Sequence, residues 1–372
     1  MPVPALDRRR FLGASALGLG ALTLPGCATT TPARTPSASR LSGCLPPVDV
    51  SAGRVIRAVA GLRPYRASGF VVRAEPLGIK RLVHNYGHGG AGITLSWGTS
   101  KLATELGLPG HPGPVAVIGC GVMGLTTARL VQEAGFPVTL YAAALPPDTT
   151  SNIAGGQWSP FGHFRPDQVT PQWREQLARA LDYSWRRFQI MIGDDYGVRW
   201  LPTYSQSPDG SAPSDAYHPG ARALSPDEHP FPAERLVRFD TMYVETGRLL
   251  RQLMRDVQLA GGRFAIRRFA AASEIAELPE SLVFNCTGLG SRELFGDQVL
   301  EPVRGQLAIL LPQPEVRYAF TGGAGYMFPR SDGIILGGTF ERGEWSAAPE
   351  PETIAEIIAS HKALFGGFRC TA

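Results

Sequence analysis

Short apolar runs alternate with amphipathic stretches in the middle of the chain. The β-branched run Val115–Ile118 predicts a buried parallel strand. Helical apolar spacing over 125–134 follows, Gly135 ends that helix, and Phe136–Tyr141 predicts the next strand. A strand, a helix and a strand of these lengths form a β-α-β unit, which predicts an α/β fold with a Rossmann-like parallel sheet.

The pattern changes after residue 165. The sequence predicts a helix at Trp173–Ile192, then a strand at Tyr196–Tyr204 and a long polar loop at 205–230. A strand at Phe239–Val244 and a second helix at Thr246–Leu259 follow. Strands at 263–268 and 281–286 are expected to return to the first sheet. Strands at 303–311, 326–328 and 334–340 predict a second, largely antiparallel sheet.

Composition describes an ordinary globular protein. The chain has 372 residues, of which 44% are hydrophobic and 18% are charged, so it is long enough for two lobes with a core each. The net charge of +4 is weak, and no basic block with interleaved aromatic residues occurs. These features argue against a nucleic-acid partner.

The N-terminus has the features of an export signal. Arginines at 8–10 precede an apolar stretch that ends at Leu24 and is too short to cross a bilayer. The Arg-Arg-x-Phe-Leu pattern resembles a twin-arginine signal, and Leu24-Pro25-Gly26-Cys27 resembles a lipobox that would place a lipid on Cys27. The sequence therefore predicts a signal at 1–27, a flexible linker at 28–50, and a periplasmic or lipid-anchored protein. Plain export with cleavage near Ala28 is the alternative.

The five cysteines indicate neither a metal site nor a nucleophile. None stands in a Cys-x-x-Cys pair or has a histidine at zinc-binding spacing. Cys120 lies inside a glycine turn and Cys286 lies at a strand end, so we interpret both as small core residues. No metal is predicted.

The turn between the first strand and helix predicts a dinucleotide site. Its glycines permit a tight turn and a close approach of the backbone to a pyrophosphate, and the helix N-terminus offers partial positive charge. The candidate cofactor residues here are Gly119, Gly121, Val122, Met123 and Gly124. The carboxylate expected to bind the ribose is absent, since the next strand ends in Ala142-Ala143-Ala144. Backbone groups or Asp148 are left for that role.

Residues 84–98 hold five glycines among histidine, tyrosine and tryptophan rings. The run His-Asn-Tyr-Gly-His-Gly-Gly-Ala-Gly-Ile-Thr resembles the last flavin-binding segment of the D-amino-acid oxidase family. Residues 149–162 and Asn285-Cys286-Thr287-Gly288 resemble two further segments of that family. The resemblance implies FAD as cofactor and these contacts to it: Gly89, Gly92, Ile93, Thr94, Thr150, Ser151, Gly155, Gly156, Gln157 and Thr287.

Two more motifs of the family hold its substrate. Gly61-Leu62-Arg63-Pro64-Tyr65-Arg66 implies that Arg63 binds the substrate carboxylate, for which a planar, permanently charged guanidinium is well suited. The segment 322–329 implies that Tyr326 shares this role, and Gly90 is implied to place its carbonyl near the substrate amine. Gly322 stands where mammalian members carry a lid tyrosine. Arg317 is interpreted as a solvated arginine, with selection of acidic substrates as the alternative.

The resemblance implies an oxidase that converts a D-amino acid to a 2-oxo acid and ammonia, with hydride transfer to flavin N5 and dioxygen reduced to hydrogen peroxide. Such chemistry needs no general base, so His84 and His88 are interpreted as parts of the flavin loop. The alternatives are a glycine or sarcosine oxidase, a dehydrogenase that reduces a quinone, and a non-catalytic FAD-binding surface protein.

The order of the motifs differs from that of the family. Residues 52–107 match the family's end, yet they precede the dinucleotide turn, which predicts a circular permutation. The predicted cofactor domain comprises 51–165 and 251–300, with 51–108 as the permuted segment. The predicted substrate domain comprises 166–250 and 301–350, and a C-terminal helix is expected within 351–372.

Overall fold

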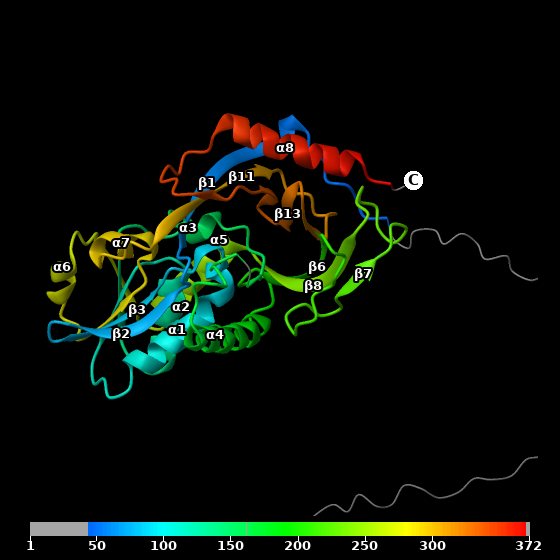
Figure 1. Cartoon of the computed structure of the whole chain (residues 1–372). Coiled ribbons are helices and arrows are strands. Elements are labelled where there is room, and N and C mark those ends of the chain that lie inside the picture. The colour runs from blue at the N-terminus through cyan, green and yellow to red at the C-terminus, as the bar shows by residue number, and fades with distance from the viewer. Residues whose placement is uncertain (1–43, 161, 370–372) are drawn as a thin grey trace, which may run out of the picture. The chain divides into compact units, whose positions relative to one another are not determined.

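The computed structural model describes residues 44–160 and 162–369, which form two β-sheets flanked by helices (Figure 1). The predicted export signal, Cys27 and residues 28–43 lie outside this part of the chain, so export stays a prediction. None of the helices within the described ranges combines the length and the apolar character that a membrane span requires.

The first sheet has six strands. Their spatial order is β2 (Val71–Leu77), β3 (Lys80–Tyr86), β10 (Leu282–Asn285), β4 (Val115–Ile118), β5 (Val138–Ala142) and β9 (Arg263–Ile266). Strands β3, β10, β4, β5 and β9 are parallel, while β2 returns antiparallel to β3. The predicted β-α-β unit is confirmed as β4, α2 (Val122–Glu133) and β5.

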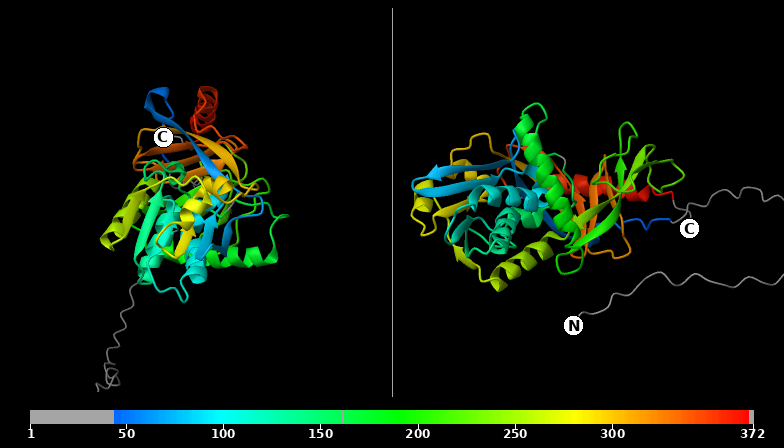
Figure 2. Two further views of the ribbon diagram at one scale, coloured as in Figure 1. Left: turned by 90° about the vertical axis from the view of Figure 1, so that its left-hand side faces the viewer. Right: turned by 90° about the horizontal axis from the view of Figure 1, so that it is seen from below.

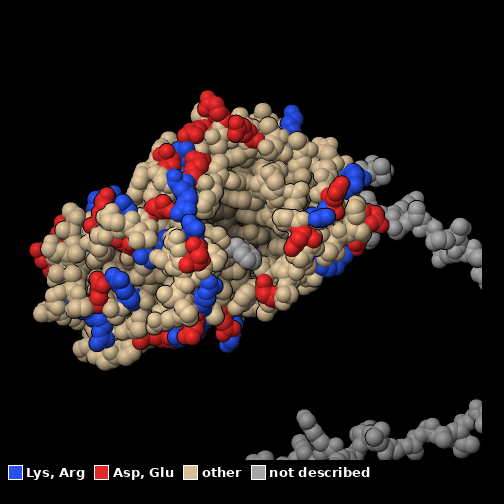
Figure 3. Space-filling model, viewed as in Figure 1, with Lys and Arg blue, Asp and Glu red and all other residues tan. Residues whose placement is uncertain are grey.

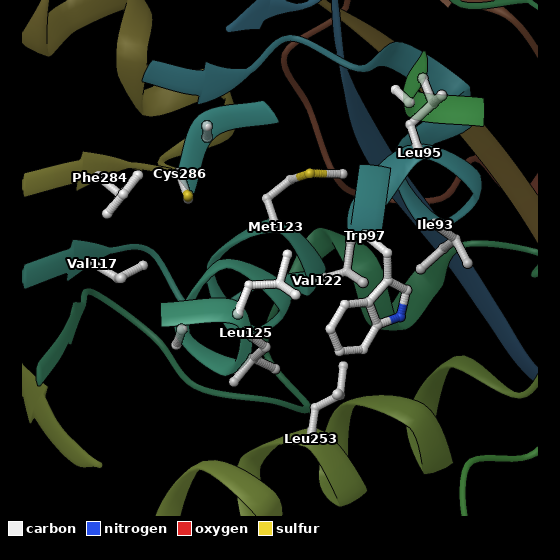
Figure 4. Close-up of a cluster of buried hydrophobic side chains, with 14 of the residues drawn as sticks. Ile93, Leu95, Trp97, Val117, Val122, Met123, Leu125, Leu253, Phe284 and Cys286 are labelled. Carbon is white, nitrogen blue, oxygen red and sulfur yellow. The ribbon is translucent and has the colours of Figure 1, made fainter. Parts of the chain in front are cut away.

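Alternate residues of these strands face two different cores. Val83, Val117 and Phe284 belong to a core with the helices α1 (Gly92–Gly107) and α2, which contact the strands directly; Figure 4 shows Val117 and Phe284 in this core. Helix α4 (Pro171–Gln189) packs on α1, and α5 (Thr246–Leu259) packs on α2. Leu82, Ala116 and Val283 face the opposite side, toward the shorter helices α6 (Ala272–Ala276) and α7 (Ser291–Leu294). Both faces of the sheet are therefore buried, as expected for parallel strands.

Helices α1 and α4 touch through their backbones. A Cβ at Gly98 would lie 1.9 Å from the carbonyl oxygen of Ala180, and the Gly98 N–H donates to Ser184 Oγ at 2.8 Å. Only glycine permits this approach. Helix α4, predicted to belong to the substrate domain, thus packs beside the first sheet.

The second sheet has nine strands. Eight of them follow the order β1 (Val55–Tyr65), β11 (Glu301–Leu310), β14 (Gly333–Gly337), β13 (Gly325–Arg330), β12 (Ala319–Gly322), β6 (Val198–Gln206), β8 (Leu236–Val244) and β7 (Arg222–Leu224), and β15 (Glu341–Arg342) pairs with β11. All pairs are antiparallel except β12 with β6. The α/β fold with a second, largely antiparallel sheet is therefore confirmed. Helix α8 (Pro351–Gly366) covers this sheet at β11, β13 and β14, as the views in Figures 1 and 2 show.

Four short helical segments complete the fold. They are η1 (Ala52–Arg54), η2 (Gly89–Ala91), α3 (Thr150–Ile153) and η3 (Gly288–Gly290). The last three of them connect strands to helices beside the site described below.

Several predicted boundaries need correction. Strand β1 was predicted within the cofactor domain, yet it pairs along its length with β11 of the nine-stranded sheet. The predicted linker ends earlier than residue 50, because Val48 and Val50 are buried against this sheet and Asp49 N–H donates to Gln313 Oε1. The loop 205–230 contains β7, and β12 was not predicted, because both strands are too short to show a period.

The predicted permutation stays a prediction. What the structure describes is the neighbourhood that it requires: β3, which leads into the glycine run 84–98, lies beside β10 and one strand away from β4.

Candidate active site

A cavity of about 800 Å³ is lined by residues of both sheets. Its walls include the carboxyl ends of β3, β4, β5 and β10 from the first sheet, together with parts of β1, β11 and β13 from the second. In open α/β sheets the carboxyl ends of parallel strands form the usual ligand site. All predicted site residues line the cavity except Thr94 and Gly124.

Those two residues shape the wall from behind. A Cβ at Gly124 would lie 1.9 Å from the carbonyl oxygen of Gly119, so the glycine allows α2 to pack closely on the turn. Thr94 Oγ1 donates to the Ser159 carbonyl at 3.0 Å and accepts from Ser159 N–H at 2.9 Å, which ties α1 to the loop 149–162.

The turn after β4 forms a cradle with room for backbone only. Gly119 has φ of +106°, and a Cβ there would lie 2.4 Å from the carbonyl oxygen of Cys286. The first residue of α2, Val122, presents its N–H toward the cavity wall and donates to Ser151 Oγ at 3.0 Å. A helix N-terminus next to glycines and a hydroxyl suits the pyrophosphate of a dinucleotide. The residues present therefore fit FAD.

The wall beyond β5 is cationic where a ribose-binding carboxylate is usual. Ala142, Ala143 and Ala144 line it, joined by Arg267 and Arg268, which follow the end of β9. Arg267 N–H donates to the Ala142 carbonyl at 2.9 Å, and its guanidinium lies 4.6 Å from the centre of the Phe269 ring. Asp148 is exposed and is not among the lining residues, which leaves backbone groups as the predicted substitute for the carboxylate.

The histidines of the glycine run are held inside the fold. His84 Nδ1 accepts from Asn285 Nδ2 at 2.9 Å, and its Nε2 faces Glu75 Oε1 at 3.0 Å. His88 is stacked on Phe70, and its Nε2 lies 3.0 Å from Thr99 Oγ1. Burial lowers the pKa of His84 and lowers that of His88 to about 3, so both rings are neutral at pH 7. Their architectural interpretation agrees with these contacts.

Arg63 lies half-buried on the cavity wall at the end of β1. Its Nη1 donates to the carbonyls of Thr339 at 3.1 Å and Arg304 at 3.3 Å. Its guanidinium covers Gly305, where a Cβ would lie 2.2 Å from Nη2. With Nη1 used by two carbonyls, the remaining N–H groups are available to the Tyr326 phenol and to a carboxylate in the cavity.

Tyr326 stands beside Arg63 on β13. Burial raises the pKa of the Tyr326 phenol, and the Arg63 guanidinium, which hydrogen-bonds it, partly opposes that rise. The phenol therefore stays protonated and can donate. Its ring stacks on Phe328 with centroids 4.4 Å apart, which fixes its direction.

Gly90 borders Arg63, because a Cβ there would lie 3.7 Å from Arg63 Cδ, and it lines the cavity together with Tyr326. The structure thus brings Arg63, Tyr326 and Gly90 to one end of the cavity.

Two other arginines do not belong to this group. Arg66 Nε donates to Asp297 Oδ2 at 2.8 Å and its Nη1 donates to the Gly69 carbonyl, so it is used by the fold. Arg317 is exposed and does not line the cavity, so it is in no position to select acidic substrates there.

The cysteines on the wall are inert thiols. Cys120 and Cys286 are buried and free, and burial raises the pKa of each to about 12. Within the described ranges no cluster of histidine, cysteine and carboxylate side chains is arranged to hold a metal ion.

The sequence interpretation missed part of the wall. The additional lining residues include Ile153, Arg267, Arg268, Gly305, Leu307 and Phe328. Arg267 and Arg268 were predicted inside a strand that in fact ends at Ile266, and the rule that ligands lie beyond strand ends would have identified them. Gly305 and Leu307 belong to a different sheet, and no local signal marks them.

Comparison with known proteins agrees with this geometry. The family model described as FAD dependent oxidoreductase (DAO) matches residues 3–106 and 114–371. A D-amino-acid oxidase of Streptomyces coelicolor is 34% identical over 68% of this chain and 78% of its own. A human D-aspartate oxidase is 30% identical over 67% and 75%.

Among solved structures, an iminodiacetate oxidase from Chelativorans sp. BNC1 shares the fold. Its TM-score is 0.51 at 15% identity, and the match covers 68% of this chain and 79% of that one.

The buried histidine of the flavin loop leads to a pH prediction. Since the pKa of His88 falls from 6.5 to about 3 on folding, the unfolded chain takes up a proton between these values that the folded chain does not. Its contribution to stability is complete above pH 6.5 and is lost as the pH falls, at up to about 1.4 kcal/mol per pH unit. We expect the His88→Gln variant to lose part of this dependence. Urea unfolding of both proteins at about pH 7 and about pH 5 checks it; parallel losses in the two would contradict it.

Proposed function

The chain belongs to the DAO family of FAD-dependent oxidoreductases, and on that premise we propose that it oxidises D-amino acids with neutral side chains. The products are a 2-oxo acid and ammonium, with dioxygen reduced to hydrogen peroxide and one water consumed. The observation that carries this proposal is the Arg63 guanidinium, oriented by two carbonyls on the cavity wall beside the protonated Tyr326 phenol.

The side chains of this site position the substrate rather than exchange protons with it. Arg63 binds the carboxylate through its free N–H groups, and Tyr326 donates a further hydrogen bond to the same carboxylate. Gly90 offers its backbone carbonyl to the amine, and the lack of a side chain there leaves space beside Arg63. These three contacts fix three groups around Cα and so determine which hydrogen faces the cofactor.

When bound, FAD supplies the acceptor for the hydride that leaves Cα. The protein needs no base for this step. His84 and His88 are neutral and buried, and their ring nitrogens contact Asn285 and Thr99, which agrees with that requirement.

A neutral substrate side chain follows from the charges on the wall. Arg63 is the cation among the described lining residues at the end of the cavity near Tyr326, while Arg267 and Arg268 lie beyond β5. A substrate with a second carboxylate would bury it without a partner, at a cost of a few kcal/mol. Uncharged residues form most of the hollow seen near the centre of the molecule (Figure 3). The Streptomyces coelicolor relative is a D-amino-acid oxidase and is more similar to this chain than the human D-aspartate oxidase, which supports a neutral substrate over an acidic one.

The decisive experiment compares substrates with FAD added. We expect D-alanine to be oxidised with a kcat/KM at least about tenfold above that of D-aspartate. Burying one unpaired carboxylate costs more free energy than the roughly 1.4 kcal/mol to which a tenfold ratio corresponds. Peroxide should form in proportion to the 2-oxo acid. Turnover of glycine or sarcosine in preference to D-alanine would favour a glycine or sarcosine oxidase. Substrate oxidation without formation of peroxide would favour a dehydrogenase that reduces a quinone. A purified protein that does not bind FAD would refute the proposal.

Arg63 should matter for the substrate and not for the cofactor. The Arg63→Ala variant is expected to bind FAD normally and to lose about a hundredfold or more in kcat/KM, because a bidentate charged partner contributes roughly 3 kcal/mol. Arg63→Lys should recover only part of this loss, since an ammonium lacks the planar fork. Flavin absorbance and steady-state rates measure the two effects. Loss of flavin from Arg63→Ala would instead assign Arg63 a structural role.

We propose in addition that the protein is exported and carries a lipid on Cys27. The twin-arginine and lipobox patterns support this location, and Cys44 is disulfide-bonded, which is typical of an oxidising compartment. In the native host, the Cys27→Ser variant should move from the membrane fraction to the soluble periplasmic fraction. An unchanged distribution between the fractions would rule out the lipid anchor.

A further inference from the structure

The carbonyls that hold Arg63 belong to a tightly connected polar cluster behind the cavity wall. Residues alternate along β11: Gly305 and Leu307 face the cavity, whereas the Arg304 and Gln306 side chains point to the other face of the strand. There they meet Glu341 on β15 and Glu350 at the start of α8. We define these four residues as the Arg304 cluster.

The Arg304 guanidinium is buried between two carboxylates. Only 5% of its side chain is exposed, and it forms ion pairs with Glu341 and with Glu350, the latter at 2.6 Å between Nη2 and Oε1. Gln306 Nε2 donates to Glu341 Oε1 at 2.9 Å, and Glu350 N–H donates to Gln306 Oε1 at 2.7 Å. Hydrogen bonds from Thr339, Gln306 and Arg304 lower the pKa of Glu341, and the Arg304 guanidinium lowers that of Glu350, so both carboxyl groups stay ionised at neutral pH.

The Arg304 cluster is directly connected to the two backbone carbonyls that orient Arg63. The carbonyl of Arg304 itself accepts from Arg63 Nη1. The other acceptor is the carbonyl of Thr339, which lies two residues before Glu341. The Thr339 hydroxyl also accepts a hydrogen bond from the backbone N–H of Gln306, at 3.0 Å. Strand β11 and residues 339–341 are thus joined on one side by the cluster and on the other by the Arg63 guanidinium.

We propose that the Arg304 cluster is the positioning device for the substrate carboxylate. By fixing the Thr339 and Arg304 carbonyls it holds Nη1 of Arg63 against the wall and leaves the other N–H groups toward the cavity. The two carboxylates also neutralise the Arg304 charge, which would otherwise compete for the substrate carboxylate. Arg304, Gln306, Glu341 and Glu350 touch neither substrate nor cofactor and act only through Arg63. This inference rests on the proposed carboxylate-binding role of Arg63.

The chain offers a matched control for this cluster. Arg342 and Glu301 lie on the same two strands and form an ion pair, yet their side chains are 45% and 33% exposed. No hydrogen bond in the described residues links that pair to the acceptors of Arg63. Glu341→Gln and Glu301→Gln therefore remove the same charge from neighbouring positions with different expected results.

Propionate serves as the probe, because it has the carboxylate of D-alanine without the amine and cannot be oxidised at that position. We measure its binding to the FAD-loaded full chain through the flavin absorbance spectrum, in parallel with FAD affinity and thermal unfolding. Glu341→Gln should weaken propionate binding and raise the KM for D-alanine about tenfold each, because the guanidinium loses its fixed direction. FAD affinity and kcat should change less than about twofold. Glu301→Gln should leave all four quantities within about twofold of the parent values.

Equal effects of Glu341→Gln and Glu301→Gln on propionate binding would overturn the proposal. So would a Glu341→Gln variant with unchanged propionate affinity. If Glu341→Gln fails to fold, Thr339→Val replaces it. This change removes the hydroxyl that accepts from Gln306 N–H and hydrogen-bonds Glu341. It should weaken propionate binding in the same direction, and unchanged binding would again overturn the proposal. If Arg63→Ala itself leaves propionate binding intact, the proposed function of Arg63 fails first, which distinguishes the two failures.

Discussion

The parallel pairing of β10 between β3 and β4 is the constraint on which the site depends. Asn285 lies opposite both His84 and Ile118, so three segments that are distant in sequence end at one edge of the sheet. The Asn285 side chain then joins these ends: it donates to His84 Nδ1 and to Ser291 Oγ and accepts from Thr287 Oγ1. Since Asn285, His84 and Ser291 are buried, each hydrogen bond left unmade among them would be costly, and the strand ends are held in one arrangement.

Close backbone contacts turn this edge into a cavity rather than a packed core. At Gly119 and Gly124 a single Cβ would collide with a carbonyl oxygen, so the turn and the first residues of α2 approach the neighbouring strand as no other residue type would allow. The same logic applies at Gly305, over which the Arg63 guanidinium lies. Glycine therefore determines both where a pyrophosphate has room and where the substrate anchor rests. The fold accepts the entropic cost of these glycines only because the ligand site needs the backbone itself.

The segment 52–107 connects the two halves of the chemistry. Its first strand, β1, crosses to the nine-stranded sheet and carries Arg63, whereas β3 and α1 remain with the six-stranded sheet and carry the flavin loop. One continuous stretch of chain thus sets the separation between the substrate anchor and the cofactor cradle. Pairing of β1 with β11 brings in the Arg304 and Thr339 carbonyls that orient Arg63. The candidate site, which spans two sheets, is fixed in this way, and Gly322 pairs with Gly325 in the tight β12–β13 turn.

The sequence by itself determined what local patterns encode. The β-branched run at 115–118, the glycine turn after it and the helix at 246–259 each follow from periodicity and from the conformations that glycine permits, and the structure confirms them. The proposed roles of Arg63, Tyr326 and the glycine run came from motifs whose order along the chain says nothing about distance. Only the tertiary structure decided that β1 leaves the cofactor domain, that Arg267 lines the cavity beyond β5, and that Arg304 and Glu341 stand behind Arg63. The reason is physical: strand pairing and buried ion pairs join residues far apart in sequence, and no single segment carries their signal.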